Sequence, residues 1–148
     1  MPTVDVVRSV TPSSSVRARL VMAMFDVPVA EKLEFRLRLD APVEDRAWSV
    51  GLIVGPSGSG KTSVLEQCFG VPPRFGWSGA ALVDDFQAER GVQEVVGALG
   101  AVGLNTVPTW AKPFSVLSNG EQFRASLARA LLEEPAGGLV LVDEFTSV

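Results

Sequence analysis

The sequence contains no histidine and only one cysteine, Cys68. The lack of histidine excludes acid–base catalysis by imidazole, and it excludes histidine ligands for a metal ion. A single cysteine excludes a disulfide within the chain and is typical of a reducing compartment. We therefore expect a cytoplasmic protein without histidine chemistry.

Long apolar runs and an excess of basic residues are also missing. No stretch approaches the roughly 18 apolar residues that indicate a membrane-spanning helix, and the N-terminus, with Asp5, lacks the apolar core of a signal peptide. The net charge is −4, from 13 basic and 17 acidic residues, so nucleic acid is not indicated, although a local basic patch is left open. With 148 residues, 47% of them hydrophobic and 20% charged, the chain has the size and composition of one globular domain.

The N-terminal part has the pattern of an antiparallel hairpin. Charged and apolar residues alternate without a break over 32–40, which predicts a half-buried strand. Its expected inward-facing side chains are Leu33, Phe35, Leu37 and Leu39. Residues 16–25 begin with the same alternation, and 26–30 can turn the chain between the two strands. We expect residues 1–15 to form a flexible arm, and a short strand within it over 4–10 is left open.

The rest of the chain has the pattern of an α/β fold with a parallel core sheet. Apolar runs predict buried strands, and apolar residues spaced three and four apart predict helices. The expected strands cover 48–54, 80–83 and 139–142; the expected helices cover 61–69, 88–99 and 118–134, and 100–117 are mostly loop. The unbroken apolar run over 139–142 is typical of parallel sheets that are covered on both faces.

A glycine-rich motif separates the expected strand at 48–54 from the expected helix at 61–69. It reads Gly55-Pro56-Ser57-Gly58-Ser59-Gly60-Lys61-Thr62 and fits the P-loop, or Walker A, pattern G-x-x-x-x-G-K-[ST] in the structural context that the pattern requires. Backbone N–H groups of such a loop, and the N-terminus of the helix, bind phosphate. The predicted nucleotide-binding residues are Gly55, Ser57, Gly58, Ser59, Gly60, Lys61, Thr62 and Ser63. Lys61 is expected to reach the β- and γ-phosphates and assist catalysis, and the Thr62 hydroxyl to bind Mg²⁺.

Two carboxylates follow the apolar run at 139–142, in the manner of a Walker B motif. Ligands of open α/β sheets lie outside the carboxyl ends of the strands. We therefore expect Asp143 to hold Mg²⁺, through water, and Glu144 to act as the general base on the attacking water. The alternative is a polar strand end that caps a loop.

The segment from Leu117 to Arg124, Leu-Ser-Asn-Gly-Glu-Gln-Phe-Arg, contains a predicted helix cap. Ser118 and Glu121 have the spacing of a capping box. The segment resembles the signature of the ABC ATPase family, usually Leu-Ser-Gly-Gly-Gln, with Asn119 and Glu121 as replacements. The order of phosphate loop, signature and acidic strand end is that of an ABC head. More narrowly, the chain is similar to soluble, non-transporter bacterial ABC-type ATPases associated with acetyltransferase-like domains.

The resemblance covers about residues 16–148 and implies a P-loop NTPase fold with a small helical subdomain over about 86–134. ABC heads pair head-to-tail around two ATP molecules, so Ser118, Asn119 and Gly120 would contact the γ-phosphate in a partner's phosphate loop. The alternative is an ordinary capped helix.

The resemblance also implies two further ligand contacts. An aromatic residue upstream of the phosphate loop stacks on adenine in this family, and Phe25 is the candidate, with a core phenylalanine as the alternative. Gln87 resembles the glutamine that senses Mg²⁺ and the attacking water; Asp84 and Asp85 are weaker substitutes.

The sequence departs from the family pattern after the Asp-Glu pair. An ABC head continues into a loop with an aspartate and then to a switch histidine, whereas this chain ends at Val148 and has no histidine. We therefore expect an incomplete head, without the C-terminal part of the domain, that a homodimer, a missing C-terminal segment or a partner chain would complete. The predicted function is binding of ATP and Mg²⁺ coupled to association, with hydrolysis uncertain. The alternative is a nucleotide-binding fragment or regulatory module without turnover of its own.

Overall fold

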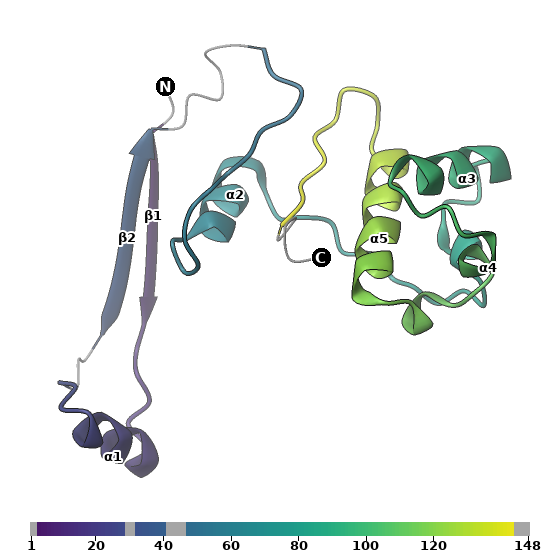
Figure 1. Cartoon of the computed structure of the whole chain (residues 1–148). Helices are drawn as coiled ribbons and strands as arrows, with labels where there is room; N and C mark the ends of the chain where they lie inside the picture. Colours follow the sequence, from purple (N-terminus) through teal and green to yellow (C-terminus); the bar gives the residue numbers. More distant parts are fainter. Residues whose placement is uncertain (1–2, 29–31, 41–46, 144–148) are drawn as a thin grey trace. The chain divides into compact units, whose positions relative to one another are not determined.

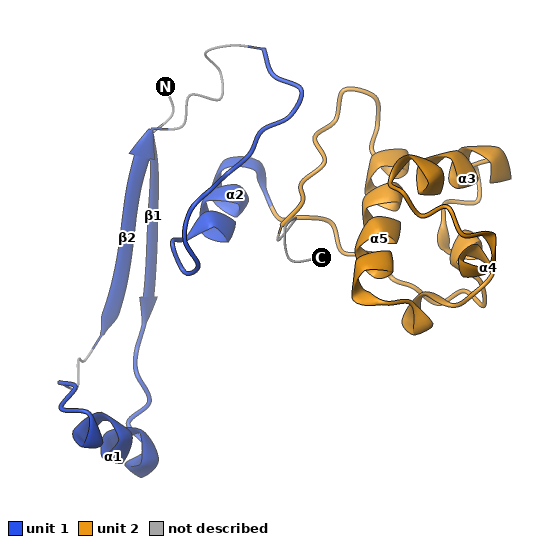
Figure 2. Ribbon diagram, viewed as in Figure 1, with its two compact units in different colours: residues 1–70 blue, residues 71–148 orange. Residues whose placement is uncertain are grey.

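The computed structural model describes residues 3–28, 32–40 and 47–143, and its fold is mixed α/β. The chain divides into two compact units, Met1–Gly70 and Val71–Val148 (Figure 2). Each unit has its own hydrophobic core.

The sheet of the first unit is a two-stranded antiparallel hairpin. β1 (Thr3–Val10) pairs with β2 (Leu33–Asp40) in a register that runs from Thr3 opposite Asp40 to Val10 opposite Leu33 (Figure 1). The strand predicted over 32–40 and its antiparallel pairing are confirmed, but its partner is the N-terminal segment. Part of the expected flexible arm is therefore a paired strand.

The prediction of a strand over 16–25 is wrong. These residues form helix α1 (Val16–Met24), which lies between the two strands in the chain and at one end of the hairpin (Figure 1). The Ser15 hydroxyl accepts the Ala18 N–H at 3.2 Å and so caps the helix. Alanine, leucine, methionine and arginine, which make up most of the segment, favour helix, and a few alternating residues do not outweigh this preference.

Helix α2 (Lys61–Phe69) has the predicted bounds and packs on the hairpin. Val64 forms the buried core of this unit with Val4 and Val6. Leu37, Leu39 and Cys68 pack around it. The other two side chains predicted to face inward on β2, Leu33 and Phe35, stay 55% and 39% exposed.

Polar contacts also tie β1 to α2. Arg8 forms an ion pair with Glu66 at 3.0 Å, and the Gln67 Nε2 donates to the Asp5 carbonyl at 2.9 Å. The hairpin therefore supports the helix that follows the glycine-rich loop.

The three predicted core strands are not strands in the structure. Residues 48–54 and 139–142 have no regular structure, and 80–83 run into the 3₁₀ helix η1 (Leu82–Asp85). Among the described residues the only sheet is the β1–β2 hairpin. The predicted parallel core sheet is absent from this part of the chain. An apolar run becomes a strand only where another strand satisfies its backbone groups.

The second unit is helical. It contains η1, α3 (Val92–Ala101), α4 (Val107–Trp110), η2 (Phe114–Val116) and α5 (Asn119–Glu133). α3 and α5 pack together within the segment expected to be a helical subdomain (Figure 1). The core consists of Leu82, Phe86, Val95, Leu99, Leu104, Leu117, Ala125 and Ala128. The prediction of mostly loop over 100–117 missed the two short helices α4 and η2.

Within the described part of the chain, no helix combines the length and the apolar character needed to cross a bilayer.

Candidate functional site

The glycine-rich loop of the first unit leads directly into α2. Gly58 and Gly60 have left-handed backbone conformations, with φ of 75° and 86°, which side chains other than glycine rarely adopt. Gly60 is the N-cap of α2 and has no side chain to cap the first turn. The N–H groups that begin an α-helix have no partner within the helix, so a glycine N-cap leaves them available to a ligand.

The first glycine of the loop lies close to the Ser59 side chain. A Cβ atom at Gly55 would lie 2.7 Å from the Ser59 hydroxyl oxygen, so this hydroxyl would have to rotate away. The Ser59 N–H donates to the Pro56 carbonyl at 3.3 Å and closes the turn. Ser57 and Gly58 lie exposed at the tip.

The Lys61 side chain folds back over the loop. Its Nζ donates to the carbonyl oxygens of Gly55 and Pro56, both at 2.9 Å. The loop therefore holds an ammonium group beside its own backbone and close to the start of α2. This arrangement concentrates positive charge and N–H donors at one place.

The two hydroxyl residues after Lys61 have different surroundings. Thr62 is exposed in the first turn of α2. Ser63 is half-buried, and its hydroxyl accepts a hydrogen bond from the Arg8 Nε at 3.4 Å. Thr62 is thus the more exposed of the two residues, while Ser63 contacts β1.

Among the described residues, an aromatic ring that the sequence pattern did not mark as a ligand contact lies against the loop. The Phe35 ring on β2 lies 3.0 Å from the position of a Cβ at Gly60. The available signal was the alternation that put Phe35 on the same face as Leu37, which itself lies 3.6 Å from the same point.

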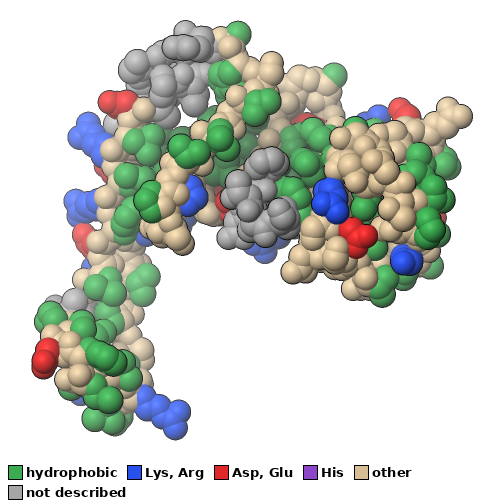
Figure 3. Space-filling view, in the orientation of Figure 1, with side chains coloured by type: hydrophobic (Ala, Val, Ile, Leu, Met, Phe, Trp, Pro, Cys, Tyr) green, Lys and Arg blue, Asp and Glu red, His purple; other side chains and the backbone are tan. Residues whose placement is uncertain are grey.

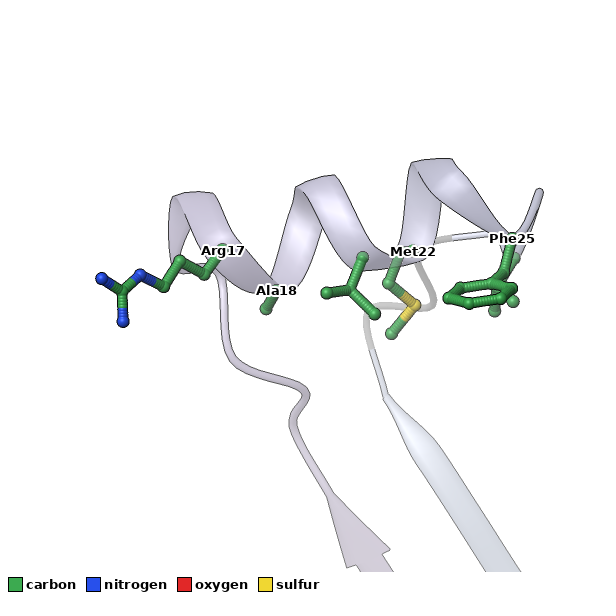
Figure 4. A pocket seen from close by; sticks show the side chains of 6 residues that line it. Arg17, Ala18, Met22 and Phe25 are labelled. Carbon is green, nitrogen blue, oxygen red and sulfur yellow. The ribbon is translucent and has the colours of Figure 1, made fainter.

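Phe25, the predicted adenine contact, lies at the C-terminal end of α1 and is 72% exposed. It lines an apolar hollow on α1 whose walls come from residues 17–27 (Figure 4). The alternative of a core phenylalanine is wrong.

The signature segment of the second unit begins α5 as predicted. Ser118 is the N-cap: its hydroxyl oxygen accepts the Glu121 N–H at 3.4 Å, and the Glu121 Oε2 accepts the Ser118 N–H at 2.9 Å and its hydroxyl at 2.7 Å. The predicted capping box is confirmed. Hydrogen bonds from the Ser118 side chain, and then from its backbone, hold the pKa of Glu121 below its usual value. Ser118 and Asn119 are exposed, and Gly120 is half-buried.

Gln87 lies exposed just after η1. Its backbone N–H donates to the Glu133 Oε1 at 3.1 Å, and the same oxygen accepts the Arg129 Nε at 2.9 Å. The Arg129 guanidinium lies 4.9 Å and 5.0 Å from the ring centres of Phe75 and Trp77. A well-packed ion pair therefore positions the backbone at Gln87.

The acidic candidates have distinct positions in the second unit. The Asp85 Oδ1 accepts the N–H groups of Ser78 and Gly79, each at 2.8 Å, and so holds a loop. Asp84 is exposed and Asp143 is half-buried, while Glu144 lies outside the described residues. No group of three or more metal-ligating Cys, Asp or Glu side chains occurs among the residues that the structure describes.

The structure thus brings the phosphate-loop residues and Phe35 together in the first unit. Gln87, Ser118, Asn119, Gly120 and Asp143 belong to the second unit. No family model, no curated protein and no solved structure matches this chain. The likeness to ABC ATPases therefore depends on the motif residues alone.

Proposed function

We propose that this chain binds ATP with Mg²⁺ through the loop from Gly55 to Thr62, in the manner of an ABC-type P-loop protein. The observation that carries the proposal is the Lys61 ammonium, which lies over a loop of left-handed glycines at the uncapped start of α2. Such a loop offers an anion a cluster of N–H donors, a helix N-terminus and a positive charge.

Phosphate is the anion that suits this arrangement. Lys61 now donates to two neutral carbonyl oxygens. Phosphate oxygens are charged acceptors and form stronger hydrogen bonds with an ammonium group, so the side chain would exchange these partners for the β- and γ-phosphates. The left-handed conformations of Gly58 and Gly60 allow the loop backbone to turn tightly before α2.

The remaining parts of the nucleotide have candidate contacts in the same unit. The Phe35 ring, which lies against Gly60, offers an aromatic face for the base; Phe25 is the other candidate. The exposed Thr62 hydroxyl is an oxygen donor of the kind that Mg²⁺ prefers.

The likeness to ABC ATPases assigns further roles to residues of the second unit. By that likeness Asp143 and Gln87 would supply oxygen ligands for Mg²⁺, and Ser118, Asn119 and Gly120 would contact the γ-phosphate of a partner in a head-to-tail pair. Support for this contact comes from the exposure of Ser118 and Asn119 at the start of α5, where the helix dipole favours an anion. Glu144 would activate the attacking water for ATP hydrolysis. The alternative is a nucleotide-binding module without turnover of its own. A cytoplasmic location, with its ATP supply, suits the single cysteine.

The test is the affinity for Mg-ATP of Lys61→Ala, measured by titration calorimetry. We expect it to fall about a hundredfold, because charge-assisted hydrogen bonds contribute about 1.5–3 kcal/mol each. Lys32→Ala is the matched control, since Lys32 is an exposed lysine of the same unit that pairs with Glu34, and it should bind as the wild type does. Unchanged binding by Lys61→Ala would show that the loop is not the phosphate site.

A further inference from the structure

One face of helix α2 rests on the hairpin, and this face extends to the glycine-rich loop. The residues that contact the hairpin recur three and four positions apart, as one face of a helix requires. They are Gly60, Ser63, Val64 and Gln67. Thr62 precedes Val64 by two residues and so lies on the other side of the helix, because two residues turn it by about 200°. The hairpin therefore holds the loop from the side opposite to the predicted Mg²⁺ ligand.

The hairpin side chains that meet this face come from paired positions on the two strands. In the antiparallel register Val6 lies opposite Leu37, and Arg8 lies opposite Phe35. Directly opposite residues have their side chains on the same face of a sheet. Figure 3 shows hydrophobic side chains along the hairpin, with basic side chains on its outer side. Phe35 thus continues the apolar row from the buried core to Gly60.

The contact between Phe35 and Gly60 is a close approach of a ring edge to the backbone. The ring atoms Cε1 and Cζ lie 3.0 Å and 3.3 Å from the position that a Cβ of Gly60 would occupy. Gly60 has a φ of 86° and is the N-cap of α2, so its conformation sets the direction in which the loop meets the helix. The ring therefore touches the residue on which the shape of the loop depends.

We propose that Phe35 is a positioning residue for the phosphates, whose ring supports Gly60 and holds the glycine-rich loop in the conformation that receives them. This inference rests on the proposed nucleotide site. Glycines give a loop many accessible conformations, and a ligand that must order the loop binds more weakly. A rigid apolar wall behind Gly60 removes part of this cost before the ligand binds. The ring acts on the phosphates through Gly60, a role separate from contact with the base.

The experiment is titration calorimetry of the full chain with Mg²⁺ and either ATP or tripolyphosphate, on the wild type and on Phe35→Ala. Tripolyphosphate supplies the phosphates without a base. We expect the affinity of Phe35→Ala for tripolyphosphate to fall about tenfold, the equivalent of ordering roughly one more backbone residue on binding. The affinity for ATP should fall at least as much. A ring that served the base alone would leave tripolyphosphate binding unchanged, and this result would overturn the proposal.

Two further variants test whether the bulk behind Gly60 is what matters. Phe35→Met keeps a long apolar side chain without an aromatic ring, and it should bind tripolyphosphate within about threefold of the wild type. Leu33→Ala is the matched control, because Leu33 lies two residues before Phe35 on the same face of β2, while the atoms nearest to Gly60 belong to Phe35 and Leu37. It should bind both probes as the wild type does. A Phe35→Met variant as weak as Phe35→Ala, or an equal loss in Leu33→Ala, would contradict the positioning role.

Hydrogen exchange without ligand separates positioning of the loop from a loss of folding. In Phe35→Ala, exchange should accelerate in peptides that cover 55–62, while β1 and the C-terminal half of α2 keep the protection of the wild type. Equal acceleration in β1 would mean that the ring supports the whole first unit, and the positioning role would be wrong.

The Lys61→Ala experiment distinguishes a failure of this inference from a failure of the proposed function. If the wild type binds, Lys61→Ala does not, and Phe35→Ala binds as the wild type does, the inference alone fails. A wild type that binds neither ATP nor tripolyphosphate would overturn the proposed function and this inference with it.

Discussion

The two units of this chain differ in how much of their shape comes from a buried core. Among the residues that the structure describes, the core of the second unit has eight buried residues, drawn from η1, α3, α5 and the segments between them. The core of the first unit has three in the described ranges, Val4, Val6 and Val64. Yet the first unit holds the glycine-rich loop. Ligand-binding loops commonly belong to the less stable regions of a protein, since they must move.

Exposed apolar side chains sharpen the contrast. In the first unit Val50, Leu52 and Val54, just before the glycine-rich loop, are 86%, 73% and 78% exposed. In the second unit the ring of Trp77 stacks on Phe114 at 4.2 Å and meets Phe86 edge-on, so large apolar groups cover one another. We therefore expect the second unit to be stable through its own packing. The first unit should gain more unfolding free energy when a ligand binds to it.

The largest effect should come from Leu99→Ala in the second unit. Leu99 is fully buried, and such a truncation costs about 2–5 kcal/mol of unfolding free energy. Hydrogen exchange of peptides from α3 and α5 should accelerate accordingly. Leu131→Ala, on an exposed leucine of α5, is the control and should change little. Equal effects of the two substitutions would mean that this core does not hold the unit together.

A smaller effect is expected from Val64→Ala in the first unit. The loss of two buried methyl-sized groups costs about 1–2 kcal/mol, and the small core around Val64 has few other residues to lose. Exchange should accelerate in α2 and β1 while α5 stays protected. Val7→Ala, on the exposed side of β1, serves as the control. If α5 also lost protection, the two units would unfold together and the contrast between them would be wrong.

The smallest effect is expected from Ser118→Ala at the start of α5. Removal of an N-cap hydroxyl costs about 1 kcal/mol, measured as urea-induced unfolding of the second unit. Thr106→Ala is the control, because Thr106 is the N-cap of α4 but makes no capping bond. The lowered pKa of Glu121 also predicts how stability depends on pH. The contribution of the Glu121 carboxylate to the free energy of unfolding is complete above its pKa in the unfolded chain, and it is lost as the pH falls through its lower pKa in the folded chain. Stability that stays constant through this range would contradict the role of the box.

The elements that the sequence predicted correctly have local signals. α2 lies between the glycine-rich loop and Gly70, and α5 begins at the Ser118–Glu121 box, so residues a few positions apart determine where each helix starts or stops. β2 follows from its own alternation. Its partner did not, because pairing with β1 joins residues up to 37 positions apart, as Thr3 opposite Asp40 shows.

The wrong predictions concern segments that need a distant partner. The apolar runs at 48–54 and 139–142 have the composition of strands, but a run of apolar residues does not specify which strand will pair with it. Residues 16–25 form a helix and not the predicted strand, because helix propensity and the Ser15 cap outweigh a short alternation.

The sequence alone determined the motif of the phosphate loop, the helix after it and the capped start of α5, since these depend on neighbouring residues. Only the tertiary structure decided that β1 pairs with β2 and that Phe35 rather than Phe25 lies against the loop. The physical reason is that each of these depends on the entropy and packing of contacts between segments far apart in the chain, which no local pattern encodes.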